Sequence, residues 1–237
     1  MGLPAGIQLK LSDAVILSTQ DSERGTKKRY FPWQFGMDYD TIGRGSAQDL
    51  FDEQLAVRDC LRGDRTGLVD WTIVSPGLFM SFLFRPDFGV VDIPGRTVRA
   101  LGSWDEKITI TDVTDIGVAV AEAVFHPAED DNSGQHNGSV LFIAGDTLSY
   151  REIADLVDQR FATDGRAQFE RQLWDDEALA RQREVDGDIV MFKYRSTFAK
   201  GKGVAWEKDD TFGAKRGLKM VDVKTYLERL DERHVKE

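Results

Sequence analysis

The side chains that most often do chemistry are sparse and widely spaced in this chain. The three histidines, His126, His136 and His234, lie far apart, and with the single cysteine, Cys60, they match no metal-ligand spacing. We therefore predict no metal site. No base neighbours Cys60 in the sequence, which favours an inert packing thiol over a nucleophile.

The segment KKRYFPWQFG, residues 27–36, is the most informative stretch. An apolar pair predicts a short strand that Pro32 ends, because proline cannot donate to a sheet ladder. An indole and an amide, Trp33 and Gln34, follow on a turn that ends in Gly36. In open α/β sheets ligands bind beyond the carboxyl ends of the strands, so we expect a ligand here. Trp33 has two interpretations, stacking on a flat ligand or filling the core.

The elements around this segment alternate between helix and strand. Helices are predicted over residues 7–18 and 48–62, and strands over 28–33 and 68–75. Such alternation predicts right-handed crossovers and a parallel sheet covered by helices, which is an α/β fold. Two strands are too few for a stable layer, so either later strands join them or strands are missing from the front.

Apolar stripes indicate which face of each helix should be buried. The first predicted helix carries Ile7, Leu11, Ala14 and Val15. The second carries Leu50, Val57 and Leu61, flanked by Phe51 and Leu55. Gln54 falls on the second stripe, so it should face inward.

The character of the chain changes after Gly77. The Phe-rich run that follows predicts a pocket wall or a second small layer. Residues 90–101 predict a hairpin. Strands are predicted over residues 108–110 and 140–144. Residues 187–220 are rich in glycine and predict an irregular region. Ser149 and Glu152 form a capping box that opens a helix.

Composition limits the classes of partner. The net charge of −10 argues against nucleic acid or an anionic membrane surface as the main partner. A single cysteine excludes an internal disulfide and favours a reducing compartment. We find no signal peptide and no apolar run of about eighteen residues. We therefore expect a cytoplasmic protein.

Several segments, taken in order, resemble one family. KKRYFPWQFG resembles the K-R-F-x-P-S-E-F-G signature of isoflavone-reductase-like and NmrA-like proteins, which are atypical short-chain dehydrogenase/reductases. The resemblance continues through DLFDEQLAVRDCLRG, WTIVSPGLF, ITITDVTDIG and AGDTLSYREIADLV. It covers about residues 7–165 well and the remainder more loosely.

The resemblance implies a Rossmann-like domain that binds NADP(H) or NAD(H), with a smaller C-terminal α+β substrate domain. Residues 1–77 would belong to the Rossmann-like domain, and residues 78–237 to the substrate domain. Part of residues 108–144 can return to the Rossmann-like domain. The implied cofactor contacts are Pro32, Trp33, Gln34, Phe35, Gly36, Pro76, Gly77, Leu78 and Phe79. The implied small-molecule substrate would meet Trp33, Met80, Phe82 and Trp104.

The family's glycine-rich phosphate loop has no counterpart here. Family members begin with a strand, that loop and a helix, whereas this chain starts near the helix before residue 28. We therefore expect an N-terminally truncated sheet lacking roughly the first third of a usual member, through an alternative start or a gene-model error. Gly43-Arg44-Gly45 precedes a helix but lacks the third glycine, which favours a flexible loop over a dinucleotide role.

Two further departures concern the implied catalytic positions. The family's lysine in F-D-x-K-x-x-V-R is Gln54 here, and its Ser-Glu pair is Trp33-Gln34. Reduction of a carbonyl needs a proton donor for the developing alkoxide, and an uncharged amide does not titrate. Gln54 therefore has two interpretations, a contact to cofactor or substrate and a hydrogen-bonded amide at the rim of the core.

Three functions remain open at this stage. The first is an NAD(P)-dependent reductase of a small, aromatic or secondary-metabolite substrate, supported by the aromatic-rich stretch. The second is a non-catalytic, NmrA-like dinucleotide-sensing regulator with a protein partner, favoured by the loss of titratable groups. The third is a truncated, inactive remnant that binds no dinucleotide.

Overall fold

The computed structural model describes residues 5–20, 27–64, 67–126, 138–163, 165–186 and 189–230. His136 and His234 lie outside the described residues. The longer helices are α1 (Ile7–Gln20), α3 (Asp49–Gly63), α5 (Val113–Phe125), α6 (Tyr150–Phe161), α7 (Asp176–Asp186), α8 (Ile189–Phe198) and α10 (Val223–Arg229). The short ones are α2 (Tyr39–Ile42), α4 (Met80–Leu83), η1 (Lys208–Asp210) and α9 (Phe212–Lys215).

A parallel sheet of three strands forms one end of the molecule. Its strands are β1 (Lys28–Tyr30), β2 (Val69–Ser75) and β7 (Ser139–Phe142), in the order β1-β2-β7. Both pairings are parallel, with Tyr30 opposite Trp71 and Ser75 opposite Phe142. The two strands expected near the N-terminus are therefore joined by a third from the later part of the chain.

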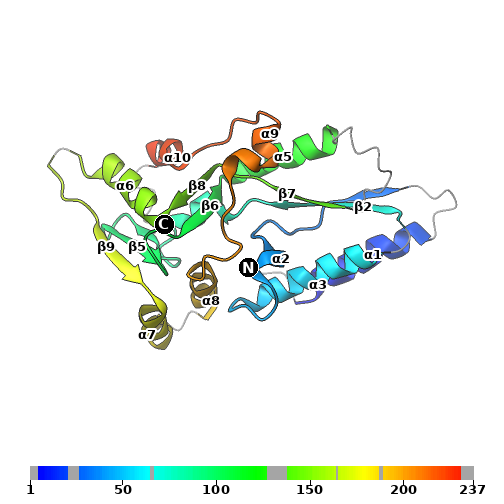
Figure 1. The fold of residues 1–237 in the computed structure, drawn as a ribbon, viewed down its shortest axis with the longest axis horizontal. Coiled ribbons are helices and arrows are strands. Elements are labelled where there is room, and N and C mark those ends of the chain that lie inside the picture. Colours follow the sequence, from blue (N-terminus) through cyan, green and yellow to red (C-terminus); the bar gives the residue numbers. More distant parts are fainter. Residues whose placement is uncertain are drawn as a thin grey trace.

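Helices cover both faces of this sheet, as Figure 1 shows. Helices α1 and α3 lie side by side on one face, and α5 and α9 lie on the other. Along β2, Trp71 and Ile73 pack toward α3, whereas Val74 packs against Ile116 and Ala119 of α5. Strand β2 is buried on both faces, which explains its nearly continuous apolar sequence. The expected α/β, Rossmann-like class is confirmed.

Two smaller sheets form the other end of the molecule. In one, β3 (Leu78–Phe79) runs parallel to β6 (Lys107–Thr111), which pairs antiparallel with β8 (Asp146–Ser149). In the other, β4 (Val91–Asp92) and β5 (Thr97–Leu101) form the expected hairpin, and β5 pairs parallel with β9 (Glu170–Trp174). The expected capping box at Ser149 is present. Each helix in the described ranges is too short or too polar to cross a membrane.

The predicted core face of α1 is wrong. Leu11 is 50% exposed, whereas Gln8 and Ser12 are buried. The polar side chains are tolerated because they are hydrogen-bonded: Gln8 Nε2 donates to the carbonyl of Trp33 at 2.9 Å, and Ser12 Oγ donates to the carbonyl of Gln8 at 3.0 Å. Val15, the last residue of the predicted stripe, does pack against the core.

Two other expectations, the burial of Leu50 and the irregular structure of residues 187–220, are wrong because tertiary packing decides both. Leu50 is 44% exposed, because α3 turns Phe51 and Leu55 toward the core instead. Residues 187–220 are not wholly irregular, since α8 occupies Ile189–Phe198. Helix α8 buries Met191 and Phe198 in the main core cluster.

Candidate functional site

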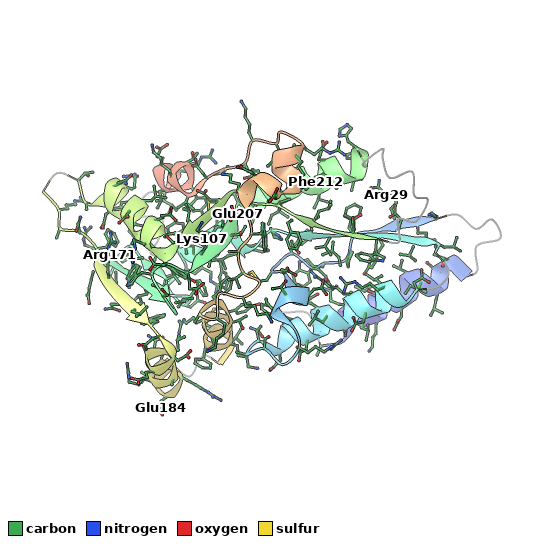
Figure 2. The ribbon with its side chains drawn as sticks, in the orientation of Figure 1. Arg29, Lys107, Arg171, Glu184, Glu207 and Phe212 are labelled. Atoms are coloured by element: carbon green, nitrogen blue, oxygen red, sulfur yellow. The ribbon has the colours of Figure 1, made fainter. Side chains whose placement is uncertain are left out.

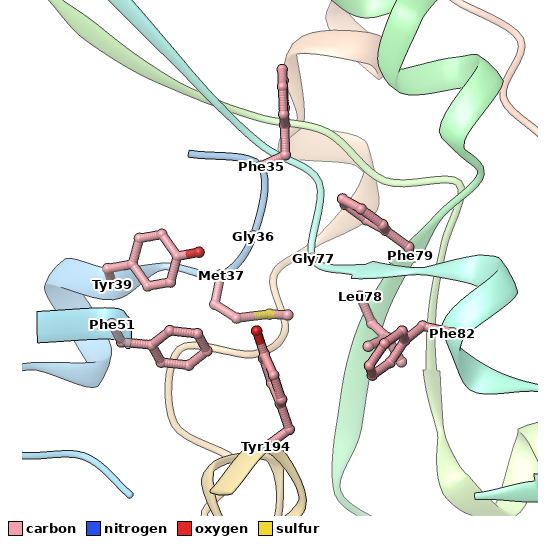
Figure 3. Close-up of a pocket in the computed structure, with 10 residues that line it drawn as sticks. All are labelled: Phe35, Gly36, Met37, Tyr39, Phe51, Gly77, Leu78, Phe79, Phe82 and Tyr194. Atoms are coloured by element: carbon pink, nitrogen blue, oxygen red, sulfur yellow. The ribbon is translucent and has the colours of Figure 1, made fainter. Parts of the chain in front are cut away.

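A cavity of about 120 Å³ lies beyond the carboxyl ends of β1 and β2. The turns that follow these strands are joined there, because the backbone N–H of Gly77 donates to the carbonyl of Gly36 at 3.0 Å. In Figure 3 the side chains of Met37, Phe51 and Tyr194 point toward one another, whereas the ring of Phe35 points away from them. The lining residues are Phe35, Gly36, Met37, Tyr39, Phe51, Gly77, Leu78, Phe79, Phe82 and Tyr194.

Both glycines at the cavity are required by close approach of other protein atoms. A Cβ on Gly77 would lie 2.3 Å from the carbonyl oxygen of Thr109, and its φ of +75° is a conformation that side chains disfavour. A Cβ on Gly36 would lie 2.0 Å from the hydroxyl of Tyr39. The glycines therefore hold the two turns tightly against their neighbours.

Beneath the cavity, one buried cation joins three segments of the chain. Arg58 of α3 has no exposed surface and donates from Nε to Oε1 of Gln34 at 2.9 Å. Its Nη1 donates to Asp40 of α2 at 2.6 Å, and its guanidinium lies over the ring of Tyr39, 5.0 Å from the centroid. Arg62 donates two further hydrogen bonds of 2.7 Å to the same carboxylate.

This cluster shifts the pKa of Asp40. The hydrogen bond from Arg62, together with that from Arg58, lowers the pKa of Asp40 from 3.8 to about 2 despite partial burial. Asp40 is therefore ionised throughout the physiological range, and the buried guanidinium keeps a charged partner.

The two amides expected at the site have different environments. Gln34 is 1% exposed and fully engaged, since its Nε2 donates to the carbonyl of Gln54 at 2.8 Å and its Oε1 accepts from Arg58. Gln54 is 6% exposed, and its side-chain Oε1 is buried with no hydrogen-bond partner among the described residues. An unpaired buried acceptor is costly. Gln54 is not among the residues that line the cavity.

The structure brings together some of the implied contacts and separates others. Phe35, Gly36, Gly77, Leu78, Phe79 and Phe82 all line the cavity. Trp33, Met80 and Trp104 do not line it: Trp33 is 51% exposed and Met80 is packed in the core. Trp104 lies half-buried at the edge of the core, under the guanidinium of Arg171. Pro32 and Pro76 are buried beside the turns.

The sequence reasoning missed Tyr194, which α8 places in the cavity wall. Its ring contacts Phe51 and Phe82 edge-on, with centroid separations of 5.9 Å in both cases. Burial raises the pKa of Tyr194, so its hydroxyl stays protonated at neutral pH. The sequence IVMFKYRSTF carries a signal for it, because its apolar residues indicate a packed helix.

The loop at Gly43-Arg44-Gly45 does not form a phosphate cradle. The N–H of Gly45 donates to both carboxylate oxygens of Asp52, at 3.0 and 3.2 Å, and Arg44 pairs with Asp59. Asp49 and Asp52 also occupy the first turn of α3, where they would repel a phosphate.

Cys60 has the environment of an unreactive thiol. Its Sγ donates to Oδ1 of Asp13 at 3.2 Å, and burial with this carboxylate raises its pKa to about 11. Among the described residues, no group of His, Cys, Asp and Glu is arranged to hold a metal ion.

A second cavity, of about 320 Å³, lies on the α5 and α9 side of the sheet. Arg29 and Phe212, which line it, are labelled in Figure 2. Its charged groups are largely engaged: Arg29 donates to the last carbonyls of α5, and His126 and Arg216 both pair with Glu122. This internal pairing leaves it a weaker candidate than the aromatic cavity.

No protein-family model matches the chain. Among curated proteins, an NmrA-like family domain-containing oxidoreductase of Gibberella moniliformis is 51% identical over 227 residues, covering 96% of this chain and 68% of that protein. Eugenol synthase 1 of Petunia hybrida is 25% identical over 226 residues, which cover 92% of this chain and 68% of the enzyme.

Solved structures show the same fold at lower identity. A structure of AtPrR2 with NADP+ and (+)pinoresinol has a TM-score of 0.68 at 18% identity, covering 93% of this chain and 68% of that one. A crystal structure of isoflavone reductase has a TM-score of 0.66 at 18% identity, covering 85% of this chain and 65% of the other.

Proposed function

The chain belongs to the NmrA-like family of oxidoreductases, and we propose that it is an NAD(P)(H)-dependent reductase of a small aromatic substrate. The observation that carries this proposal is the aromatic cavity at the carboxyl edge of the parallel sheet. Ligands of open α/β sheets bind at this edge. AtPrR2, whose structure was solved with NADP+ and (+)pinoresinol, has the same fold.

The residues present suit the nicotinamide end of such a cofactor. The unpaired Oε1 of Gln54, which lies outside the cavity lining, would accept from a ribose hydroxyl, and the turns at Pro32–Gly36 and Pro76–Phe79 would flank the nicotinamide ring. When bound, the reduced cofactor supplies a hydride. The loop at Gly43-Arg44-Gly45 offers no cradle for the pyrophosphate, because the N–H of Gly45 already donates to Asp52.

We further propose that the two parts of the chain contribute different walls of one site. Phe35 and Phe51 come from residues 1–77, whereas Phe82 and Tyr194 come from residues 78–237. The apolar lining excludes water and favours a flat ring, because aromatic pairs stack or meet edge-on at separations of about 4.5–7 Å. The substrate ring would therefore meet residues of both parts of the chain.

A second candidate is a dinucleotide-sensing regulator that acts through a protein partner. The observation that favours it is Gln54, a neutral amide at the position where the family signature has lysine. An amide can hold a ribose hydroxyl without transferring a proton. The same cavity would then bind the cofactor without turnover.

Oxidation of NADPH in the presence of aromatic and aliphatic aldehydes separates the two functions. We expect turnover with aromatic aldehydes such as benzaldehyde and far less with hexanal. NADPH binding without turnover of any carbonyl compound would favour the regulator. Absence of NADPH and NADH binding would contradict both, and would instead support a protein that binds no dinucleotide.

A further inference from the structure

The cavity wall is mostly aromatic, and it contains two hydroxyl groups. Six of its ten lining residues carry aromatic rings, and its only polar side-chain groups are the hydroxyls of Tyr39 and Tyr194. Figure 3 shows both hydroxyls directed toward the space around Met37. A polar ligand atom in this cavity would therefore meet a tyrosine.

The two hydroxyls differ in availability. Tyr39 is 4% exposed, and its hydroxyl is packed against Gly36, so no ligand atom has room beside it. Tyr194 is only partly buried, and its Oη has no hydrogen-bond partner among the described residues. Of the two, Tyr194 is the donor that remains available for a ligand.

The volume of the cavity limits what can enter it. At about 120 Å³ it is well below the 300–1,000 Å³ that is usual for whole drug-sized ligands. An apolar cavity of about 150 Å³ is enough to hold benzene. The cavity therefore has room for no more than one aromatic ring, and every other group of a substrate or of the cofactor would lie outside it.

We propose that Tyr194 is a catalytic residue of this site, donating a hydrogen bond and then a proton to the oxygen of a single-ring aromatic carbonyl compound. This inference rests on the proposed reductase function. It supplies the proton donor that Gln54 cannot provide.

The step balances with a reduced nicotinamide dinucleotide as the reductant. The carbonyl carbon accepts the hydride, the C=O π pair moves to oxygen, and this oxygen takes the proton of Tyr194 Oη to give an alcohol. Because an alkoxide is a stronger base than a phenolate, the proton moves in the favourable direction. Solvent then reprotonates the tyrosine, and the dinucleotide leaves oxidised.

The first test is binding to the full chain without cofactor, with benzaldehyde and toluene as probes. Tyr194→Phe keeps the ring and removes the hydroxyl. Loss of one hydrogen bond should weaken benzaldehyde binding by about five- to tenfold, while toluene binding changes by less than about twofold. Tyr226→Phe is the matched control, because that half-buried tyrosine stacks on Phe84 outside the cavity lining, and it should alter neither probe.

Equal changes for benzaldehyde and toluene would overturn the proposal, since Tyr194 would then act by shape alone. Failure of the wild-type chain to bind either probe would overturn it as well. Binding of benzaldehyde without binding of NADPH would instead remove the reductase function and leave only the ring site.

A second readout applies if turnover is observed. Tyr194→Phe should lower kcat by about 10²-fold or more, the usual contribution of a general acid, with a much smaller change in KM. A change confined to KM would contradict a role in proton transfer.

Discussion

Arg58 Nε donates a 2.9 Å hydrogen bond to Oε1 of Gln34, and this bond joins the middle of helix α3 to the turn after strand β1. The same guanidinium also binds Asp40 of α2. One side chain thus fixes three segments that surround the aromatic cavity. The family signature contains an arginine at this position, and the structure gives it a positioning role.

Removal of this arginine should destabilise the fold strongly. Arg58→Met leaves Oε1 of Gln34 buried without a donor, so we expect the free energy of unfolding to fall by about 3–5 kcal/mol in urea titrations. Arg44→Met is the matched control. Its ion pair with Asp59 is more than half exposed on both sides, so removing it should cost about 0–1 kcal/mol. Similar effects of the two variants would contradict the positioning role of Arg58.

The stability contributed by Asp40 should depend on pH in a defined window. Its pKa is about 2 in the folded protein and 3.8 ordinarily, so its contribution is complete above about pH 4. Below that, the unfolded state takes up the proton first, and the contribution is lost as the pH falls toward 2. We expect the stability difference between wild type and Asp40→Asn to shrink over this interval. A difference that stays constant from pH 6 to pH 2 would refute the assignment.

Gly77 should be far less tolerant of alanine than a glycine on a helix surface. Gly77→Ala places a Cβ against the carbonyl of Thr109 at a positive φ, and we expect it to cost at least about 2 kcal/mol. Gly117→Ala, on the exposed side of α5 with nothing within 4 Å, should stabilise by about 0.5–1 kcal/mol. Thermal or urea unfolding of both variants decides this, and a harmless Gly77→Ala would mean that the turn has more room than described.

Gln54 should matter for the ligand more than for folding. Gln54→Met removes an unpaired buried acceptor, so stability should be unchanged or rise by up to about 1 kcal/mol. Affinity for NADPH should fall by about five- to tenfold, measured by fluorescence titration. Leu50→Met, on the exposed face of the same helix, should change neither quantity. A loss of stability with unchanged affinity would favour the interpretation of Gln54 as a structural amide.

Local sequence signals predicted much of the fold. Each of these signals depends on neighbours within a few residues. They are the proline and glycine that end the strands, the turn of the hairpin, and the capping box at Ser149. Resemblance to the family then brought Phe35, Gly36, Gly77 and Phe79 together correctly at one sheet edge. Those features need no knowledge of distant contacts.

The failures concern faces and partners that only the tertiary structure decides. On α1, the polar side is buried because Gln8 donates a hydrogen bond to the carbonyl of Trp33. The helical period of the sequence does not predict that bond. On α8, Tyr194 reaches a cavity whose other walls are more than a hundred residues earlier in the chain. Periodicity identifies a helix, but it does not identify what the helix meets.

The most direct test of the central claim is the melting temperature of the purified chain titrated with NADPH and, separately, with NADH. Binding to the folded state should raise the melting temperature. The stabilisation should be roughly 2.7–4.1 kcal/mol when the dinucleotide concentration is a hundred to a thousand times its dissociation constant. We predict a saturable rise with at least one of the two dinucleotides, reduced in Gln54→Met. A cooperative melt that neither dinucleotide shifts would contradict the account, and the proposed reductase function would fall with it.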